Sequence, residues 1–339
     1  MITIKEMASI VGVSPTTVSN VIRGKTKEVS PELAEKIQKV VEEYNYVPNR
    51  SAINLAKNNS NVIGFVMSTN SVLYDNIVQD FFTGELIGAL EIGVRKRGYF
   101  LMIYSSDDME EIRSFVSSWN IDGIVALGFS YESAQILKNI YKKPLVFIDG
   151  YFLNDEHQYS NVGIEDYRGA FEMTQYLIRE GHRKIAFFSD NYIGGDYARY
   201  MGFLDAIKAA GLSSDCGYKY KIEKKLDGIK KGVEDVIREH PKVSALFFCS
   251  DNYAVSAMGI LSDLGIKIPD DISVAGYDDA VVASFIRPKL TTVKQSTGEK
   301  AEIAVEKLVA MIENKTEEPE KITLPVTLQI RDSVKKIEA

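Results

Sequence analysis

The sequence has few of the residues that build metal centres, disulfide scaffolds and nucleophilic active sites. Its 339 residues include only two cysteines, Cys216 and Cys249, and three histidines. The cysteines do not have a metal-ligand spacing, and the histidines are not arranged as in a zinc site or beside an activated nucleophile. We therefore expect free thiols, no metal, no cofactor and no enzymatic activity.

The chain also has no recognisable signal peptide and no apolar run of membrane-spanning length, so we expect a cytoplasmic protein without a membrane partner. The net charge of −7 does not indicate a polyanion-binding protein as a whole. The charge is uneven, however, because residues 1–57 carry eight Lys/Arg and six Asp/Glu. A mildly basic first segment on an acidic body suggests that one end contacts phosphate.

The first 22 residues predict two short helices joined by a tight turn. Gly12 can end the first helix in a left-handed conformation. Ser14 can cap the second helix, and Pro15 suits its first position, which needs no backbone donor. The apolar residues recur at helical spacing and are Ile4, Met7, Ala8, Val11, Val18, Val21 and Ile22. A third helix is expected after Ser30-Pro31-Glu32, with a buried stripe formed by Leu33, Ile37, Val40, Val41 and Tyr44.

The outward face of the second helix is small and polar, which together with the turn is the helix-turn-helix pattern of DNA-binding proteins. Thr16 and Pro15 are placed to reach base edges, whereas Ser14, Thr17 and Ser19 fit phosphate contacts or caps. Two ordinary helices in a larger core are the alternative. We favour DNA binding because the cap, the turn, the spacing and the polar face agree. The predicted contacts here are Ser14, Pro15, Thr16, Thr17, Ser19, Asn20 and Arg23.

Residues 46–57 predict a short segment that is helical only when something packs against it. Pro48 ends what precedes it, and Asn49 can cap a helix from Arg50 to Ala56. Seven residues are fewer than the roughly 12–15 that an isolated helix needs in water. A flexible linker is the alternative.

From residue 62 onward, buried strand patterns alternate with helical patterns. This alternation indicates an α/β body with parallel sheets covered on both faces, and its length indicates two such lobes. Strands are expected near residues 63–67, 100–104, 123–127, 145–148, 184–188, 245–249 and 273–276. Helices are expected, among others, near residues 86–97, 170–178, 203–210 and 254–264.

In open parallel sheets, ligands bind beyond the carboxyl ends of the strands. That rule nominates residues 68–70, 149–151, 189–190 and 250–251, together with Asp278. Arg199 is expected to begin the helical region 199–210. Carboxylates and one arginine around a cleft can form paired hydrogen bonds to sugar hydroxyls. The aromatic residues that could cover a sugar face are Tyr74, Phe81, Phe82 and Tyr151. The alternative for each strand-end aspartate is to cap the next helix.

Three other motifs do not indicate a functional site. His182 is interpreted as a structural loop residue. Asp278-Asp279 resembles a metal-binding pair, but no further ligands are suitably spaced. Gly194-Gly195 is not expected to open a helix after a phosphate loop, so a nucleotide-binding fold is not indicated.

Nearly the whole chain resembles the family of transcription regulators that includes the lac and purine repressors. The resemblance is carried by residues 13–14 (VS), 17–19 (TVS), 46–49 (YVPN), 181–186 (GHRKIA), 276–279 (GYDD) and 288–293 (PKLTTV). It implies two lobes like those of periplasmic sugar-binding proteins, with crossovers near Asn161, Leu290 and Ile322. It also implies a hinge helix in which Leu55 opens a base step from the minor groove, and effector contacts at Asp149, Arg199 and Asp278.

The sequence departs from the family pattern at several of these positions. Ser250 stands where asparagine is frequent, and Glu165-Asp166 stands where Asp-Asn is frequent. The segment 70–83 is slightly longer than usual. Asn20 replaces a frequent arginine, which favours adenine over guanine at that base or a phosphate contact. These departures leave the effector's identity open.

We therefore predict a helix-turn-helix head at residues 1–47, a hinge at 48–60 and a body at 61–339. The first lobe is expected at about 61–161 and 291–321, and the second at about 162–290 and 322–332. The expected function is a homodimeric repressor that binds a palindromic DNA operator and is controlled by a small polar effector, a sugar. A sugar-binding protein without a DNA role, a nucleobase or other metabolite as effector, and a sugar-modifying enzyme are the alternatives. The further predicted contacts are Asn49, Arg50 and Leu55 for DNA and Asn70, Phe82, Asp149, Tyr151, Arg199, Ser250 and Asp278 for the effector.

Overall fold

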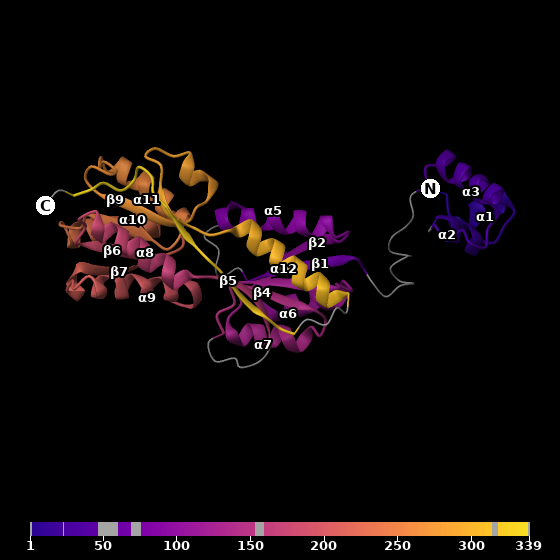
Figure 1. Ribbon diagram of the computed structural model, residues 1–339, viewed down its shortest axis with the longest axis horizontal. Helices are drawn as coiled ribbons and strands as arrows, with labels where there is room; N and C mark the ends of the chain where they lie inside the picture. The colour runs from indigo at the N-terminus through magenta and orange to yellow at the C-terminus, as the bar shows by residue number, and fades with distance from the viewer. Residues whose placement is uncertain are drawn as a thin grey trace. The chain divides into compact units, whose positions relative to one another are not determined.

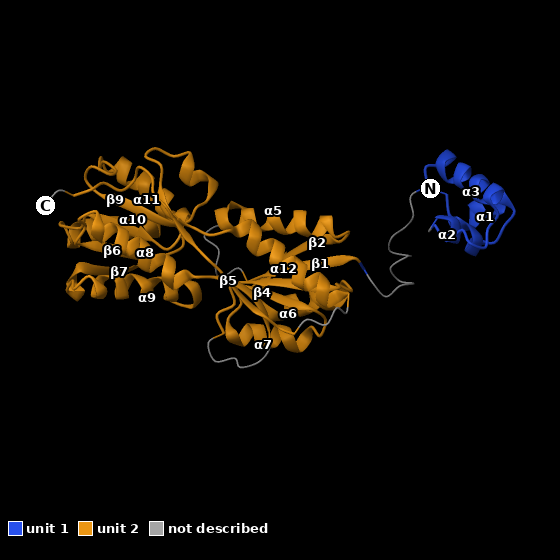
Figure 2. Ribbon diagram, in the orientation of Figure 1, with its two compact units in different colours: residues 1–60 blue, residues 61–339 orange. Residues whose placement is uncertain are grey.

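A computed structural model of the chain divides into two compact units, residues 1–60 and residues 61–339 (Figure 2). The structure describes residues 2–22, 24–46, 60–68, 76–152, 159–313 and 318–337. The predicted hinge helix at residues 50–56 lies outside the described residues.

The described residues of the first unit form three helices, α1 (Ile4–Val11), α2 (Pro15–Ile22) and α3 (Pro31–Glu43). The side chain of Thr3 caps α1 and forms a reciprocal capping box with Glu6, and Gly12 ends that helix with φ of 79°. Ser14 Oγ accepts a hydrogen bond from the Thr17 amide at 3.1 Å, which caps α2 as predicted. The buried core residues are Met7, Ala8, Val11, Val18, Val21, Ile37 and Val40.

One prediction for α3 is wrong. Tyr44 was placed on the buried stripe, but it lies beyond the last helical residue and is 47% exposed. Its amide still makes the helical bond to the carbonyl of Val40, but Tyr44 is the cap residue at the end of α3 and its ring stays exposed.

The second unit contains two six-stranded sheets. In the first sheet the strand order is β11-β5-β4-β3-β1-β2, and in the second it is β12-β10-β9-β8-β6-β7. The strands of the first sheet are β1 (Val62–Met67), β2 (Phe100–Ser105), β3 (Gly123–Leu127), β4 (Leu145–Ile148), β5 (Ser160–Ile164) and β11 (Lys321–Leu324). Those of the second are β6 (Ile185–Ser189), β7 (Gly217–Lys221), β8 (Ala245–Phe248), β9 (Ser273–Asp278), β10 (Thr291–Lys294) and β12 (Thr327–Gln329).

Among the described strand pairs, only β10 and β12 run antiparallel, so the predicted parallel α/β class is confirmed. The helices that accompany the first sheet are α5 (Phe81–Lys96), α6 (Met109–Ser118), α7 (Tyr131–Ile140) and α12 (Thr297–Ile312) (Figure 1). Those that accompany the second are α8 (Asp166–Arg179), α9 (Gly194–Ala209), α10 (Leu226–Glu239) and α11 (Asp251–Asp263) (Figure 1). The described connections include the short 3₁₀ segments η2 (Ile77–Gln79), η3 (Ser214–Cys216) and η4 (Val281–Ser284). We call the two sheet-and-helix layers the first and second lobes.

The chain passes between the lobes three times: after β5, between β10 and α12, and between β11 and β12. The sequence analysis placed the return to the first lobe at about residue 291, but residues 291–294 belong to the second sheet. Two hydrogen bonds of β10 explain why this strand belongs to the second sheet. The Thr291 amide donates to Ser333 Oγ at 2.8 Å, and Thr292 Oγ1 donates to Asp251 at 2.6 Å. Specific buried hydrogen bonds therefore hold this strand in the second lobe.

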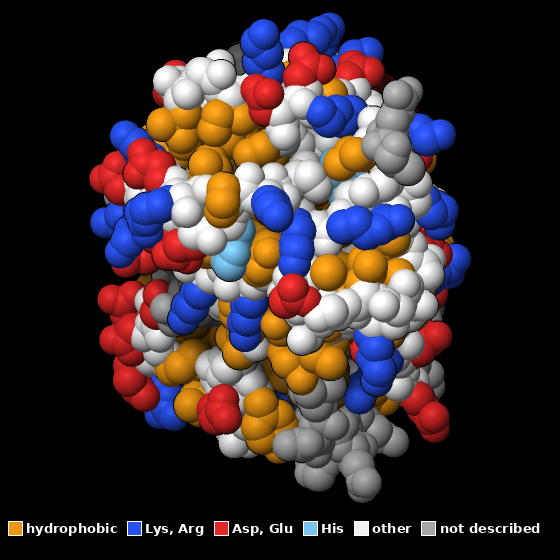
Figure 3. All heavy atoms as spheres, turned by 90° about the vertical axis from the view of Figure 1, so that its left-hand side faces the viewer, with side chains coloured by type: hydrophobic (Ala, Val, Ile, Leu, Met, Phe, Trp, Pro, Cys, Tyr) orange, Lys and Arg blue, Asp and Glu red, His pale blue; other side chains and the backbone are white. Residues whose placement is uncertain are grey.

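The surface of the second unit is mixed in character on the face shown in Figure 3, where basic and acidic side chains alternate with apolar ones. Such intermixed charge differs from the continuous basic stripe that tracks nucleic-acid phosphates. Within the described residues, no helix has both the length and the apolar character needed to cross a membrane.

Candidate effector site and DNA-reading helix

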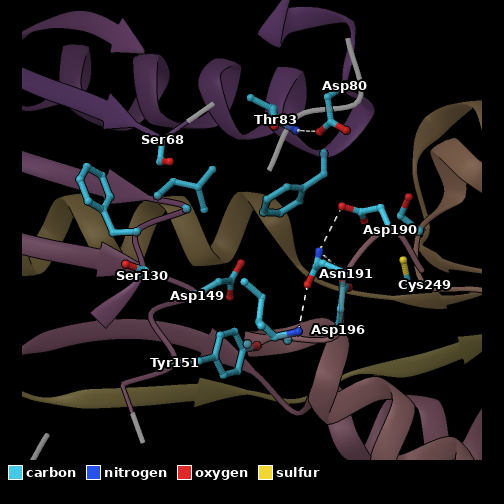
Figure 4. Close-up of a pocket in the computed structure, with 18 of the residues that line it drawn as sticks. Ser68, Asp80, Thr83, Ser130, Asp149, Tyr151, Asp190, Asn191, Asp196 and Cys249 are labelled. Carbon is cyan, nitrogen blue, oxygen red and sulfur yellow. Dashed lines mark hydrogen bonds between the residues drawn. The ribbon is translucent and has the colours of Figure 1, made fainter. Parts of the chain in front are cut away.

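A cavity of about 760 Å³ lies between the two lobes and is lined by residues of both. Several lining residues follow directly on strands, including Ser68 after β1, Asp149 after β4 and Ser250 after β8. This is where ligands bind in open parallel sheets, and the volume is that of ordinary small-molecule sites. Figure 4 shows polar side chains pointing into this cavity from opposite sides.

Arg199 is the one cation among the described residues that line the cavity. Its Nε donates to Asp166 Oδ1 at 2.6 Å, and its guanidinium lies 3.7 Å from the centre of the Tyr277 ring. Asp278 Oδ1 lies 3.9 Å from Arg199 Nη1. These contacts with the Asp166 carboxylate and with the face of the Tyr277 ring hold the arginine in one orientation.

Burial has a strong effect on the carboxyl groups around this arginine. It raises the pKa of Asp166 and of Asp278, while the nearby Arg199 acts in the opposite direction on both. The arginine's own pKa lies well above its usual value despite burial, because the surrounding acids favour its charged form. Removing Arg199 would leave buried acids without their cation.

The prediction that a helix begins at Arg199 is wrong, because α9 begins at Gly194. The residue before it, Ile193, supplies no side-chain cap. The start therefore lacks the polar capping residue by which the starts of α2 and α3 were predicted, and Gly194-Gly195 opens this helix. Arg199 consequently lies in the second turn of α9, and it lines the cavity from there.

Asp149 reaches the cavity from the first lobe and is paired with a lysine that is completely buried. Lys300 Nζ lies 2.7 and 2.9 Å from the two carboxylate oxygens of Asp149 and 2.7 Å from Gln295 Oε1. Gln295 in turn donates to Asp278 at 2.7 Å. A chain of hydrogen bonds thus joins the predicted contact of the first lobe to that of the second, through the crossover between β10 and α12.

Lys300 and Gln295 were missed by the sequence analysis, although one signal was available. Lys300 precedes Ala304 and Leu308 at intervals of four residues, so it interrupts the buried stripe of α12. A lysine in such a stripe needs a buried partner.

Tyr151 connects the lobes by a second route. Its hydroxyl donates to Asp166, and its ring lies against Gly194 and Gly195, where a Cβ would come within 3.1 Å of it. The two glycines therefore make room for this tyrosine at the start of α9. Phe82, the other described aromatic that was predicted and lines the cavity, has Lys300 Nζ 5.0 Å from its ring centre. Phe81 does not line the cavity.

The six described effector-contact candidates, Phe82, Asp149, Tyr151, Arg199, Ser250 and Asp278, all line the cavity. Asn70, Thr69 and Tyr74 lie outside the described residues. Ser68 and Asp190 also line the cavity, whereas Asp251 does not. Asp251 is fully buried and accepts hydrogen bonds from the Ala280 amide and from Thr292, so its role is structural.

Two motifs with weaker signals also prove structural. His182 is fully buried, with Nδ1 2.9 Å from Ser244 Oγ and Nε2 3.2 Å from the Lys335 carbonyl, which confirms its interpretation as a loop-structure residue. Burial lowers its pKa to about 4. Asp279 is paired with Arg331 and with Lys294.

One group of described side chains has the spacing of metal ligands: Asp190, Asp196 and Cys249 have ligand atoms within 4.8 Å of one another. The carboxylates already have partners, since Asn191 Nδ2 bonds both of them and Lys224 Nζ is 3.4 Å from Asp190. Burial raises the pKa of the Cys249 thiol well above its usual value, so the thiolate that metals prefer is disfavoured.

In the first unit, the residues predicted to read DNA lie on or just before α2. Ser14, Pro15 and Thr16 are exposed, and Thr17, Ser19 and Asn20 are half-buried. Ser14 Oγ and Thr17 Oγ1 also bond each other at 2.9 Å, which leaves Thr16 as the exposed hydroxyl of the first turn that has no such role. Arg23, Asn49, Arg50 and Leu55 lie outside the described residues.

These features define a helix-turn-helix protein with a two-lobed ligand-binding body. A family described as bacterial regulatory proteins, lacI family, matches residues 3–49, and a periplasmic binding protein-like domain matches residues 174–334. The chain is 30% identical to the HTH-type transcriptional repressor PurR of Vibrio vulnificus over 99% of this chain and 100% of that protein. It is also 30% identical to the ribose operon repressor of Haemophilus influenzae over 98% and 99%. The chain belongs to the lacI family of bacterial regulatory proteins.

Solved structures agree with this assignment. A transcriptional regulator CelR–cellobiose complex has a TM-score of 0.72 and 27% identity over 98% of this chain and all of that one. A lac repressor dimer bound to operator has a TM-score of 0.85 over 98% and 99%, and its 21% identity supports the fold. The predicted class of DNA-binding transcription regulator, rather than enzyme, is therefore confirmed.

Proposed function

We propose that this protein is a homodimeric repressor that reads a palindromic operator with α2 and is controlled by a sugar bound between its lobes. The observation that carries the effector assignment is the cavity itself. Asp149 from the first lobe and Arg199 and Asp278 from the second all line it. Fixed carboxylates and a guanidinium provide the paired acceptors and donors that hydroxyl groups need, and Phe82 and Tyr151 provide aromatic surface for a sugar ring.

The position of these groups supports a mechanism of control. A ligand that bonds Asp149 and Arg199 together stabilises one arrangement of the two lobes over others. Because the lobes are joined by three crossovers, and the Gln295–Lys300 hydrogen bonds run along one of them, the energy of ligand binding acts on their relative position. A change in that position alters how two heads are presented to DNA, which is the coupling that allostery requires.

The homodimer is supported by apolar side chains that are exposed in the single chain. On the first lobe, Phe100 and Ile103 of the edge strand β2 are 52% and 41% exposed. On the second lobe, Val281 and Phe285 are 63% and 72% exposed. Large apolar groups of this kind on both lobes indicate a surface that another subunit covers. Two heads on a two-fold axis then match a palindromic site.

The experiment uses full-length protein and DNA recovered from a random duplex library by repeated binding. We expect an enriched palindrome, and an affinity for it that falls steeply as salt concentration rises. Sugars, nucleobases and amino acids are then added at fixed DNA concentration, and DNA binding is followed by fluorescence anisotropy. A sugar is expected to change the operator affinity, and the Asp278→Asn variant is expected to lose this response.

The matched control is Glu132→Gln, which removes one negative charge from an exposed residue at the same cavity. It is expected to keep the sugar response. Enrichment of no palindrome would contradict the operator assignment. A nucleobase or amino acid acting where no sugar acts would contradict the effector assignment alone.

A further inference from the structure

The cavity has a strong excess of acidic groups. Among its described lining residues, seven side chains are carboxylates and one, Arg199, is a cation. The undescribed segments 69–75 and 153–158 contain no lysine or arginine in their sequence. A neutral sugar needs acceptors and donors together, whereas a carboxylate excess attracts a positively charged ligand.

Two of these acids face each other from different lobes. Asp80 caps α5 in the first lobe, where it accepts a hydrogen bond from the Thr83 amide at 2.8 Å. Asp190 follows β6 in the second lobe, and Figure 4 shows both carboxylates on the same side of the cavity. The negative charge of Asp190 is one cause of the raised pKa of Asp80, after burial. The two groups are therefore close enough to repel.

The available cations neutralise this cluster only in part, because Lys224 pairs with Asp190 and no lysine or arginine of the described residues pairs with Asp80. Lys224 lies 3.4 Å from Asp190. Arg199 lies 3.9 Å from Asp196, but its short contact is with Asp166 at 2.6 Å. Within the described part of the chain, Asp80 has no lysine or arginine in ion-pair distance, and its recorded side-chain partner is the amide of Asn252.

Asn252 provides an independent sign of a missing donor. Its side chain is 3% exposed and lines the cavity, and its Nδ2 donates to Asp80. That bond fixes the orientation of the amide, so Oδ1 is an acceptor, and Oδ1 has no hydrogen-bond partner among the described residues. Buried acceptors without donors are rare in folded proteins and call for an explanation.

We propose, building on the sugar-effector function above, that the effector is an amino sugar whose protonated amine binds among Asp80, Asp190 and Asn252. An ammonium group has three donors and no acceptor. It supplies the donor that Asn252 Oδ1 lacks and the positive charge that Asp80 lacks. The hydroxyl groups of the same sugar remain for Asp149, Arg199 and Asp278.

The charge of the ligand then contributes to closure of the lobes. Without a cation, bringing Asp80 toward Asp190 costs electrostatic energy, which protonation of the acids reduces. An ammonium between them replaces that repulsion by two charge-assisted hydrogen bonds from opposite lobes.

The test is calorimetric titration of the full chain with matched triplets: glucose, glucosamine and glucuronate, and the corresponding galactose and mannose series. In the triplet that binds, we expect the amine to bind about tenfold or more tightly than the neutral sugar, as a new charge-assisted contact predicts. The uronate is expected not to bind.

Two variants localise the effect. Asp190→Asn and Asp80→Asn are each expected to reduce the preference for the amine about tenfold while leaving the neutral sugar within about threefold. Glu110→Gln, which removes the same charge from an exposed side chain that does not line the cavity, is expected to leave the preference unchanged.

The outcomes separate the two proposals. If a neutral sugar or a uronate binds as tightly as the amine, or if both aspartate variants keep the amine preference, the amino-sugar inference is overturned and the sugar-effector function stands. If no sugar of any charge binds, both are overturned. Binding of Mg²⁺ or Zn²⁺ alone that displaces the amine would also overturn the inference, since the cluster would then be a metal site.

Discussion

The DNA-reading head and the effector cavity place their functional groups in opposite environments. On α2 the candidate contacts are neutral side chains at the surface, and the small core below them is entirely apolar. In the cavity the candidate contacts include charged side chains that are largely buried, such as Arg199, whose side chain is 12% exposed, and Asp278, which is 9% exposed.

This difference decides how function and stability are related in each unit. An exposed hydroxyl can be removed with little effect on folding, so the DNA face can change its specificity freely. A buried charge can be removed only together with its partner, because the remaining charge is left without compensation. We therefore expect substitutions in the head to separate function from stability, and substitutions in the cavity to change both.

The largest effect is expected for Arg199→Met. Asp166 and Asp278 then remain buried without their cation, so the free energy of unfolding should fall by about 3–5 kcal/mol, with loss of effector binding. Urea unfolding followed by circular dichroism measures this. Asp166→Asn added to Arg199→Met should recover part of the loss. The control, Arg113→Met, removes an arginine that is 55% exposed and pairs with Glu110, and its effect should be below about 0.5 kcal/mol. Equal losses in the free energy of unfolding for the two arginine variants would contradict the proposed difference between buried and exposed charges.

The next effect depends on pH and concerns His182. Its folded-state pKa is about 4 against an ordinary value of 6.5, so between these values the unfolded chain binds a proton that the folded chain does not. This histidine therefore contributes a loss of stability of about 3 kcal/mol as the pH falls from 7 to 4. Raised carboxyl pKa values act with the opposite sign, so the useful quantity is the difference between wild type and His182→Asn. The stability advantage of the wild type should shrink toward pH 4; a difference independent of pH would show that the histidine titrates normally.

A smaller effect is expected in the head for Thr3→Ala. The substitution removes the side chain that accepts from the Glu6 amide and breaks the capping box of α1. Loss of such a cap costs about 1 kcal/mol. Thermal melting of the full chain should show a lower melting temperature for the head, while the melting temperature of the body stays unchanged. Thr3→Ser keeps the hydroxyl and should melt like the wild type.

The smallest effect on stability is expected for Thr16→Ala, which removes an exposed hydroxyl. The melting temperature should stay within error of the wild type, while relative affinity among operator variants changes. Anisotropy titrations with a panel of single-base operator variants measure the change. A uniform loss on every sequence would identify Thr16 as a phosphate contact instead.

Much of the fold could be predicted because its signals are local. Gly12, Ser14 and Pro15 mark the turn and cap of the head within four residues, and strands such as β3 and β4 read directly as apolar runs. The start of α9 could not be predicted, because Ile193 supplies no cap. The position of β10 depended on bonds from Thr291 and Thr292 to residues about 40 positions away.

The candidate site was predicted in part for the same reason. The strand-end rule located Asp149, Ser250 and Asp278, but it nominated Asp251 equally, and only the bonds to Ala280 and Thr292 show that this residue faces away. Asn252, the next residue, lines the cavity and was missed, because no sequence pattern distinguishes the two.

The sequence by itself determined the helical head, the alternation of strands and helices, and the residue types at the strand ends, since each depends on neighbours within a few positions. The tertiary structure decided which charges meet. Lys300 lies against Asp149 across 151 positions of sequence, and Asn252 against Asp80 across 172. The first pair forms when α12 packs on the first sheet, and the second forms only when the two lobes lie beside each other. Burial in the second pair raises the pKa of Asp80, which no local sequence pattern could show.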